Sequence, residues 1–293
     1  MMLYKGSGVA LVTPFDDGGI NFKALDQLIE WHINEGTDAL IVGGTTGEAS
    51  TLTLDERSQL FTHTVQKVNK RIPVVAGTGS NSTATSIKYS QQAQACGVDG
   101  LLIVTPYYNK CTQKGLIAHY RAIAESVDLP IILYNVPSRT SVNMIPETVK
   151  VLSEIQNIVG IKEASADITQ IVELFSLVDD SFAVYSGNDD HVFPLLALGA
   201  QGVISTVANI IPKMMHDLTS EYFSGNYEAS KRIQYQINPL VKAVFTEVNP
   251  IPVKAGVNLL GFAAGPVRLP LTPAEPKTTE TLIANLNALG VKI

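Results

Sequence analysis

Residues 158–165 read Ile158-Val159-Gly160-Ile161-Lys162-Glu163-Ala164-Ser165. The apolar run before the lysine is too short for a helix and rich in β-branched residues, which predicts a buried strand that ends in an amine. An ammonium buried without a partner is costly, so Lys162 either pairs with a carboxylate or loses its proton and becomes a nucleophile. Glu163 points to the other face of the strand, which weakens the ion-pair interpretation.

Other short apolar runs along the chain resemble this one. They are continuously apolar, which is typical of strands buried on both faces in a parallel sheet. Helix-length segments alternate with them, and this repeated alternation predicts an α/β fold, a (β/α)8 TIM barrel. The predicted strands are 9–12, 39–42, 74–76, 101–104, 131–134, 158–162, 182–185 and 202–204, and the predicted helices between them include 22–35, 55–69, 82–95, 113–126 and 146–154.

The chain continues well beyond the eighth predicted strand. The remaining residues contain more helices than the eighth unit needs, so we expect a barrel over residues 1–225 and a C-terminal helical extension over residues 226–293. The segments predicted to be helical and to lie beyond the eighth unit are 213–223, 227–245, 252–260 and 277–289.

The composition is typical of a globular protein, with 293 residues of which 45% are hydrophobic and 16% charged. The net charge is −6 and the bases are dispersed, which argues against a nucleic-acid-binding surface. The N-terminus lacks the long apolar region of a signal peptide, and no stretch approaches the roughly 18 apolar residues of a membrane span. We therefore expect a cytoplasmic protein without nucleic-acid or membrane partners, and with Cys96 and Cys111 as reduced thiols.

Polar residues directly after the predicted strands are the candidates for chemistry, because active sites of such barrels lie at the carboxyl ends of the strands. The loop Gly43-Gly44-Thr45-Thr46-Gly47 offers backbone amides and two hydroxyls that suit a carboxylate or phosphate. An ordinary glycine turn is the simpler interpretation of this loop taken alone. Glu48 opens the next helix, and we expect it to cap that helix rather than to act in catalysis.

Two tyrosines and an arginine follow other strands. Tyr134 and Tyr108 are usable proton carriers if a cation or hydrogen bond lowers their pKa, and Lys162 is a candidate neighbour. Arg139 follows Tyr134 across a turn, and its planar guanidinium suits a substrate carboxylate. A tyrosine at such a position, taken singly, is more often an amphipathic edge of the core, and Arg139 is equally a solvated loop residue.

The sequence predicts no metal site. The histidines are scattered without ligand spacing or a close carboxylate, so we expect them on the surface or satisfied in the core. They are His32, His63, His119, His191 and His216.

Four motifs carry a resemblance to a known family. They are Gly44-Thr45-Thr46-Gly47-Glu48, Tyr134-Asn135-Val136-Pro137-Ser138-Arg139-Thr140, Gly160-Ile161-Lys162-Glu163 and Asn249-Pro250-Ile251-Pro252-Val253-Lys254. With these motifs the chain resembles the dihydrodipicolinate synthase family over essentially its whole length. The wider group of pyruvate-dependent class I aldolases and lyases shares the tyrosine and the lysine, whereas the arginine marks the branch that uses aspartate semialdehyde.

The resemblance implies a lyase of diaminopimelate and lysine biosynthesis that condenses pyruvate with L-aspartate 4-semialdehyde and needs no metal or organic cofactor. It implies that Lys162 forms a Schiff base with pyruvate and that Tyr134 shuttles protons. Thr45 and Tyr108 would complete the proton relay, with Tyr108 reaching in from a neighbouring subunit.

The resemblance also implies substrate contacts and an assembly. Arg139 would hold the carboxylate of the semialdehyde and Thr46 that of pyruvate, while backbone groups at Gly187 and Ile204 would line the pocket. The assembly would be a homodimer, or a homotetramer made of two tight dimers.

One departure concerns regulation. Lysine-inhibited members of the family carry a histidine and a glutamate where this chain has Leu54 and Thr85, although Asn81 and Tyr107 are retained. We therefore expect weak or absent inhibition by lysine.

Two other interpretations compete with the main one. An N-acetylneuraminate lyase or a 2-keto-3-deoxy sugar acid aldolase would use the same lysine, but Arg139 and the Thr45-Thr46 pair favour a small acidic aldehyde. A non-catalytic pyruvate-binding barrel would leave Lys162, Tyr134 and Tyr108 without a function.

Overall fold

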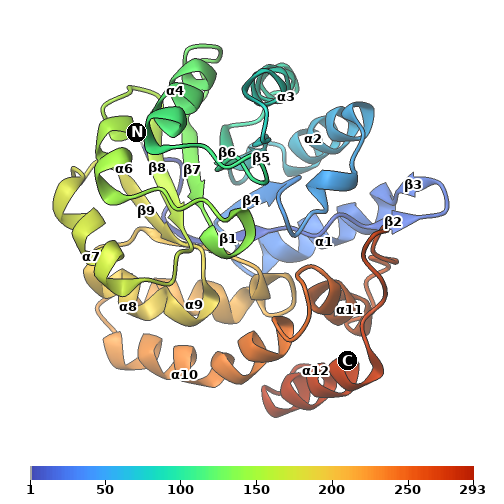
Figure 1. Cartoon of the computed structure of the whole chain (residues 1–293). Coiled ribbons are helices and arrows are strands. Elements are labelled where there is room, and N and C mark those ends of the chain that lie inside the picture. The colour runs from blue at the N-terminus through green and yellow to red at the C-terminus, as the bar shows by residue number, and fades with distance from the viewer. Residues whose placement is uncertain (1) are drawn as a thin grey trace.

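Parallel strands form the centre of the molecule. The computed structural model describes residues 2–293, and within these residues eight parallel strands close into a barrel in the order β1-β10-β9-β8-β7-β6-β5-β4 (Figure 1). The predicted TIM barrel is confirmed. The barrel strands are β1 (Gly6–Ala10), β4 (Ala39–Val42), β5 (Val74–Gly77), β6 (Gly100–Val104), β7 (Ile131–Asn135), β8 (Ile158–Glu163), β9 (Ala183–Ser186) and β10 (Gly202–Ser205).

The first strand begins earlier than predicted, at Gly6 rather than at Val9. Glycine is a poor strand former by propensity, but a side chain does not fit here, because a Cβ on Gly8 would lie 2.5 Å from the Tyr4 hydroxyl. The strand also ends earlier, and the Val12 N–H donates to the Asn209 side chain at 2.9 Å instead of to a neighbouring strand. The close approach of Tyr4 therefore leaves no room for a side chain at Gly8.

Helices cover the outside of the barrel (Figure 1). Many begin at a capping side chain, and α2 has a full capping box in which Thr53 and Glu56 exchange hydrogen bonds. The long barrel helices are α1 (Phe22–Asn34), α2 (Leu54–Val68), α3 (Thr83–Ala95), α4 (Gln113–Ala124), α6 (Pro146–Ser153), α7 (Ile168–Leu177), α8 (Val192–Leu198) and α9 (Pro212–Phe223). Shorter turns are α5 (Pro137–Thr140), η1 (Ala49–Thr51), η2 (Asp189–His191) and η3 (Val207–Asn209).

The C-terminal helices pack beside the barrel. Helix α9 packs against β1 and completes the eighth unit, and it lies within residues 1–225, the part of the chain predicted to form the barrel. Beyond it, α10 (Tyr227–Val244) packs on α9, and α12 (Pro276–Ala288) packs on α10 and on α11 (Ile251–Leu259). The predicted C-terminal helical extension is present, while a division into two domains at residue 225 stays a prediction.

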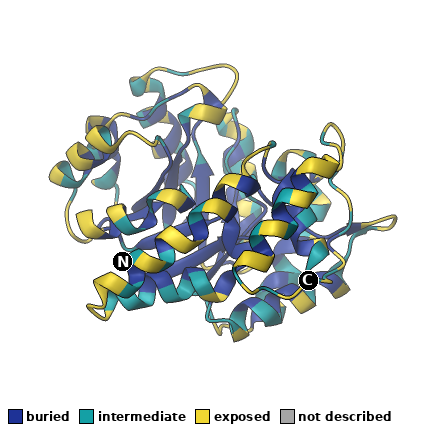
Figure 2. Cartoon of the chain, turned by 90° about the horizontal axis from the view of Figure 1, so that it is seen from below, coloured by how far each residue is buried: buried dark blue, intermediate teal, exposed yellow. Residues whose placement is uncertain are grey.

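The core has two layers. Inside the barrel, Tyr4 stacks on Tyr185, and Ile41, Ile132 and Ile204 belong to the same inner cluster. A larger apolar layer lies between the sheet and the helices. Figure 2 shows buried strands at the centre and exposed faces along the outer helices. Within residues 2–293, no helix is both long and apolar enough to cross a bilayer.

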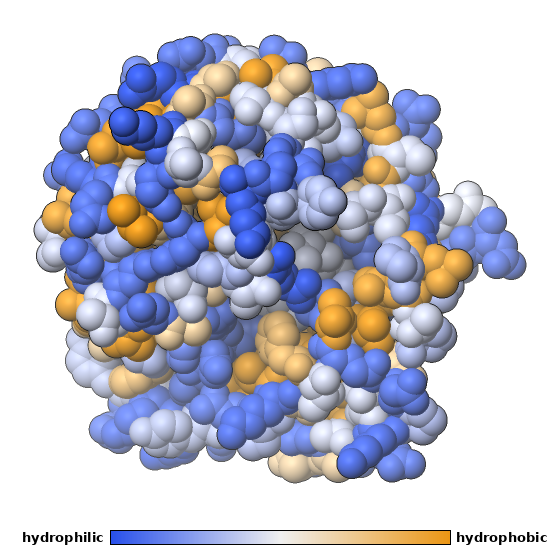
Figure 3. Space-filling model, in the orientation of Figure 1, coloured by the Kyte–Doolittle hydropathy of each residue, from blue (hydrophilic) through white to orange (hydrophobic). Residues whose placement is uncertain are grey.

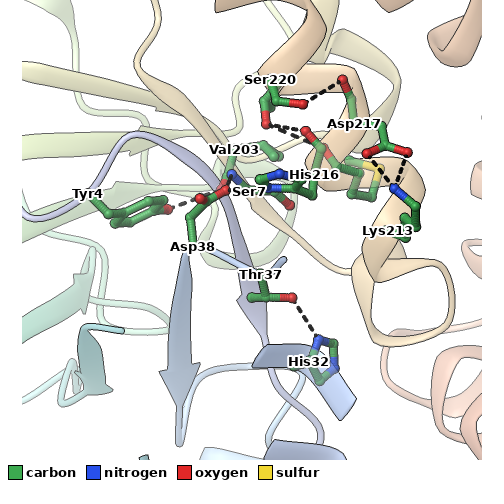
Figure 4. Close-up of polar contacts among 12 residues, drawn as sticks. Tyr4, Ser7, His32, Thr37, Asp38, Val203, Lys213, His216, Asp217 and Ser220 are labelled. Atoms are coloured by element: carbon green, nitrogen blue, oxygen red, sulfur yellow. Dashed lines mark hydrogen bonds and ion pairs between the residues drawn. The ribbon is translucent and has the colours of Figure 1, made fainter. Parts of the chain in front are cut away.

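A polar cluster ties the amino ends of the strands to α9 (Figure 4). The Asp38 carboxylate accepts the Ser7 N–H at 2.8 Å and lies 3.2 Å from His216 Nδ1, while the Tyr4 hydroxyl donates to the Val203 carbonyl at 3.0 Å. Burial raises the pKa of Asp38, and the contacts with Ser7 and His216 oppose that rise. This end of the barrel is therefore closed by packing and hydrogen bonds.

A small hairpin that the sequence analysis did not anticipate precedes α1. Its strands are β2 (Phe15–Asp16) and β3 (Gly19–Ile20), and the Asp16 side chain accepts the Gly18 N–H at 2.8 Å in the turn. The strands are too short to give an alternating pattern, but Asp-Gly and Gly-Gly pairs are typical turn signals. The hairpin places Phe15 in the core beside the C-terminal part of the chain.

Candidate active site

A cavity of about 1050 Å³ lies at the carboxyl ends of the barrel strands. Figure 3 shows a hollow near the centre of this face. Six of the eight predicted site residues line the cavity, namely Thr45, Thr46, Tyr134, Arg139, Lys162 and Gly187. Residues far apart in the sequence thus meet because their strands run parallel and end at the same face.

Lys162 lies near the end of β8 and is paired in register with Tyr134 of β7. Its side chain is 4% exposed, and Nζ lies 4.5 Å from the centroid of the Tyr134 ring. The pKa of Lys162 is lowered to about 8, mainly by burial; the Asp189 charge opposes this fall and the Arg139 charge adds to it. The fraction of free amine near neutral pH is therefore far larger than for a lysine in water.

Glu163, the residue after Lys162, lies on the other face of the strand as predicted. Its carboxylate accepts hydrogen bonds from the Asn135 side chain at 3.1 Å and the Ser165 N–H at 2.6 Å. These donors occupy Glu163 away from the cavity. The expectation that it does not pair with Lys162 is confirmed.

Tyr134 is buried at the mouth of the barrel. Burial raises its pKa, while the Arg139 charge and a hydrogen bond with Thr45 lower it. The contact with Thr45 connects the phenol to the loop after β4, so a proton can pass between hydroxyl groups without leaving the cavity.

The glycine loop after β4 is held from several sides. Gly43 has φ +62°, and a Cβ there would lie 2.9 Å from the Phe61 ring, so the turn requires glycine. The Thr13 hydroxyl donates to the Gly47 carbonyl at 2.8 Å. The Thr46 hydroxyl accepts a hydrogen bond from Asn249 Nδ2 at 2.9 Å. The loop is therefore built as a fixed element of the cavity.

Arg139 reaches the cavity from the short helix α5. Its Nη2 donates to the backbone carbonyl of Asn249 at 3.3 Å. Asn249 thus contacts both Arg139 and Thr46, a role that the sequence analysis did not assign to it. The sequence showed Asn249 only as part of the motif 249–254. Nothing in the neighbouring residues indicates that a residue of the C-terminal extension reaches the mouth of the barrel.

Asp189 is a second residue that the sequence analysis did not select. Its Oδ2 accepts the N–H groups of Thr206 and Val207 at 3.0 and 2.9 Å, while its Oδ1 has no hydrogen-bond partner among the described residues. Its charge raises the pKa of Lys162. The available signal was its position directly after a predicted strand.

Two predicted residues stand apart from the cavity within the described chain. Ile204 is fully buried in the inner cluster of the barrel. Tyr108 is 91% exposed and adopts φ +72°, while its neighbour Tyr107 lines the cavity. The expected contribution of Tyr108 to a neighbouring subunit stays a prediction.

The structure corrects the interpretation of Glu48. Its side chain makes no capping hydrogen bond to η1 within the described residues. Instead it forms a buried ion pair with Lys254, with Nζ 2.6 Å from Oε1. Sequence reasoning missed this pair because the two residues are 206 positions apart.

The histidines also differ from expectation. His63 and His216 do lie close to carboxylates, at 2.7 Å from Asp26 and 3.2 Å from Asp38. In the core, His32 Nδ1 lies 3.0 Å from the Thr37 hydroxyl, but its Nε2 has no partner among the described residues. Residues 2–293 contain no group of three or more His, Cys, Asp or Glu residues arranged to hold a metal ion.

Comparison with known proteins places this geometry in a family. The model of the dihydrodipicolinate synthetase family matches residues 3–289. The chain belongs to this family. The matched residues include both the barrel and the C-terminal helices α10, α11 and α12, so the cavity and the segments that surround it are compared as one unit.

Individual relatives agree over the full length. A 4-hydroxy-tetrahydrodipicolinate synthase of Thermoanaerobacter sp. (strain X514) is 56% identical over 292 residues, covering 99% of this chain and 98% of that relative. The crystal structure of the dihydrodipicolinate synthase of Thermotoga maritima has a TM-score of 0.97 at 48% identity, covering 99% of each chain. The chloride-inhibited dihydrodipicolinate synthase of Acinetobacter baumannii, solved in complex with pyruvate, has a TM-score of 0.95 at 45% identity, covering 98% of this chain and 99% of that one.

Proposed function

We propose that this protein condenses pyruvate with L-aspartate 4-semialdehyde to give 4-hydroxy-tetrahydrodipicolinate, through a Schiff base on Lys162. The observation that carries the proposal is the buried amine of Lys162, with a pKa lowered to about 8, beside Tyr134 in the cavity. Membership of the dihydrodipicolinate synthetase family supports the choice of substrates.

The first half of the reaction uses Lys162 and Tyr134. The free amine attacks the ketone carbon of pyruvate, and loss of water leaves a positively charged iminium. This charge withdraws electrons, so a proton leaves the methyl carbon and an enamine forms. We assign the carriage of protons to Tyr134 and Thr45, with Tyr108 of a neighbouring subunit completing the relay.

The second half joins the two substrates. The enamine carbon attacks the aldehyde carbon, and the resulting oxyanion takes a proton to become the 4-hydroxyl group. The amino group of the adduct then attacks the iminium carbon and displaces Lys162, which closes the ring and frees the enzyme. Arg139 would bind the semialdehyde carboxylate and Thr46 the pyruvate carboxylate, with Gly187 at the pocket wall.

Trapping the imine tests this proposal. The protein is incubated with pyruvate, reduced with borohydride and digested, and the adduct is located by mass spectrometry. Lys254 is an internal control, because its burial also lowers its pKa to about 8 but Glu48 holds its amine. An adduct on Lys162 alone is expected, and an adduct elsewhere or none at all would refute the mechanism.

A panel of aldehydes then separates the substrate classes. L-Aspartate 4-semialdehyde is expected to react far faster than N-acetylmannosamine or aldoses, the partners of pyruvate in sugar acid lyases and aldolases. Pyruvate binding without turnover of any aldehyde would instead indicate a non-catalytic barrel. The family assignment and Arg139 at the cavity favour the semialdehyde.

Regulation and assembly complete the proposal. We expect weak or absent inhibition by lysine, because Leu54 and Thr85 replace the histidine and glutamate of lysine-inhibited members, and a micromolar inhibition constant would contradict this.

We propose that the protein acts in the cytoplasm as a homodimer or as a tetramer of two dimers. Sedimentation velocity measures which assembly forms.

A further inference from the structure

Lys254 is a second buried lysine, and it joins the C-terminal extension to the loop that carries Thr45 and Thr46. Its amine lies 2.6 Å from the Glu48 carboxylate, and the side chains of both residues are 1% exposed. Lys254 belongs to α11, whereas Glu48 ends the glycine loop after β4. The ion pair therefore connects two parts of the chain that are remote in sequence.

The surroundings hold this ion pair from several directions. Glu48 Oε2 accepts the backbone N–H of Arg268 at 2.8 Å, so both carboxylate oxygens are engaged by the C-terminal part of the chain. Arg268 also donates to Glu56 at 2.9 Å. The Phe15 ring covers the site, with its centroid 4.2 Å from Lys254 Nζ and 3.9 Å from Arg268 Cζ.

Stability alone is a weak reason for such a pair. The free-energy cost of desolvating two charges offsets much of the attraction between them, and replacing a buried ion pair by apolar residues is often neutral or stabilising. Glu48, however, adopts the left-handed conformation with φ 56° and ψ 40°, which non-glycine residues adopt rarely and only when the surroundings impose it. The ion pair thus involves a residue with a rarely adopted backbone conformation at the end of the glycine loop.

We propose that Lys254 and Glu48 are positioning residues that fix the loop of Thr45 and Thr46 in the geometry that binds the pyruvate carboxylate. This inference rests on the proposed function. Neither residue lines the cavity within the described chain, so both act through the loop rather than on the substrate. The C-terminal helices are thereby part of the active-site geometry.

A neighbouring contact supports the same role for the start of α11. Asn249 lies just before this helix, and its side chain donates to the Thr46 hydroxyl at 2.9 Å. Its backbone carbonyl accepts from Arg139 at 3.3 Å. The segment from Asn249 to Lys254 thus contacts the glycine loop at both Thr46 and Glu48, and a shift of α11 would move both points together.

The test separates positioning from stability. Lys254→Met leaves an unpaired carboxylate, Glu48→Gln leaves an unpaired ammonium, and the double variant leaves neither. We expect each single variant to lower Tm and to raise KM for pyruvate about tenfold or more, with a much smaller change in kcat at saturating pyruvate. In the double variant Tm is expected to recover while KM stays raised.

Lys213→Met is the matched control, because Lys213 forms an exposed ion pair with Asp217 at 2.9 Å on α9. It is expected to change neither KM nor kcat. A wild-type KM in the double variant, or in either single variant that folds, would overturn the positioning role. If the single variants fail to fold, the double variant decides alone.

The two proposals fail in different ways. Absence of a borohydride-trapped adduct on Lys162 in the wild-type protein would refute the proposed function. A normal adduct in the wild-type protein together with an unchanged KM in the variants would refute only the positioning role of Lys254 and Glu48.

Discussion

The protonation of Lys162 is the most direct consequence of the structure that can be measured. The amine is buried beside one cation, Arg139, and near one carboxylate, Asp189, and these two charges act on its pKa in opposite directions. Arg139→Gln removes the cation and is expected to raise the pKa of Lys162. Asp189→Asn removes the carboxylate and is expected to lower it.

The magnitude follows from the change in pKa. A fall from 10.5 to about 8 corresponds to about 3 kcal/mol of preference for the neutral amine. At pH 7 about one Lys162 in ten is then a free amine, compared with about one in three thousand for a lysine in water, a gain of roughly 300-fold in nucleophile. Burial is the main cause of the lowered pKa, so the pKa of Lys162 should stay well below 10.5 in both charge variants.

Competitive labelling with trace acetic anhydride measures this pKa directly. The reagent acylates only the free amine, and mass spectrometry reports the extent of labelling of each lysine as the pH is varied from about 6 to about 11. Lys213 provides a reference at high pH, because its hydrogen bond to Asp217 raises the pKa of this exposed amine. The labelling of Lys162 is expected to rise with a midpoint near pH 8, and the measurement needs neither substrate nor turnover.

Two results would refute this reasoning. A midpoint near 10.5 for wild-type Lys162 would mean that burial does not favour the free amine. Shifts of the same sign in Arg139→Gln and Asp189→Asn would mean that the local charges do not act on Lys162 as their positions indicate.

Four further predictions address the remaining groups. Tyr134→Phe is expected to lower kcat about 100-fold or more while the pyruvate adduct on Lys162 is still trapped, since imine formation precedes the proton transfers assigned to this phenol. Lys162→Met is expected to abolish trapping and to raise the free energy of unfolding at pH 7 by up to about 3 kcal/mol, because a buried charge is removed. This gain in stability should vanish above about pH 10.5, where the lysine of the unfolded wild-type chain is also neutral. Urea unfolding at both pH values checks this prediction. Burial lowers the pKa of His32 to about 3, so below about pH 6.5 this residue binds a proton in the unfolded chain but not in the folded one. The folded protein is therefore expected to lose about 2 kcal/mol of stability between pH 7 and pH 5. His32→Asn should reduce this loss of stability, measured as the free energy of unfolding in urea. Mixing Tyr108→Phe chains with Lys162→Met chains should restore activity if Tyr108 serves the neighbouring subunit, because each mixed dimer then has one complete site, whereas no recovery in verified mixed dimers would contradict that placement.

The sequence predicted the barrel because its evidence is local. A strand buried on both faces must be apolar along its length, and that pattern is visible at residues 101–104 or 131–134 without knowledge of their neighbours. The first strand was placed too late because Gly6 and Gly8 carry no apolar signal. Both positions need glycine for tertiary reasons, because a Cβ on Gly6 would meet the Asp38 carboxylate and a Cβ on Gly8 would meet the Tyr4 hydroxyl.

The sequence predicted the site residues that lie at the ends of barrel strands, and it missed the residues that the C-terminal extension contributes. Lys162 and Tyr134 could be paired in advance, because the carboxyl ends of parallel strands meet at one face. Asn249 and Lys254 could not be placed, because their partners Thr46 and Glu48 lie about two hundred positions earlier in the chain. Glu48 was wrongly interpreted as a helix cap for the same reason, because the residues next to it in the sequence are compatible with a cap and do not indicate its ion pair with Lys254.

The comparison of Lys162 with Lys254 shows what makes a buried lysine reactive. Burial lowers the pKa of each to about 8, so the tendency to lose a proton does not distinguish them. Lys254 donates to Glu48 at 2.6 Å, and its lone pair becomes available only if that hydrogen bond breaks and leaves a carboxylate unpaired in the core. Lys162 has an aromatic ring at 4.5 Å and a cavity in front of it, so loss of its proton leaves no unpaired charge in contact with it. Under the proposed mechanism, reactivity therefore depends on which buried amine lacks a contacting anion: the amine of Lys162 is free to react, whereas Glu48 holds the amine of Lys254.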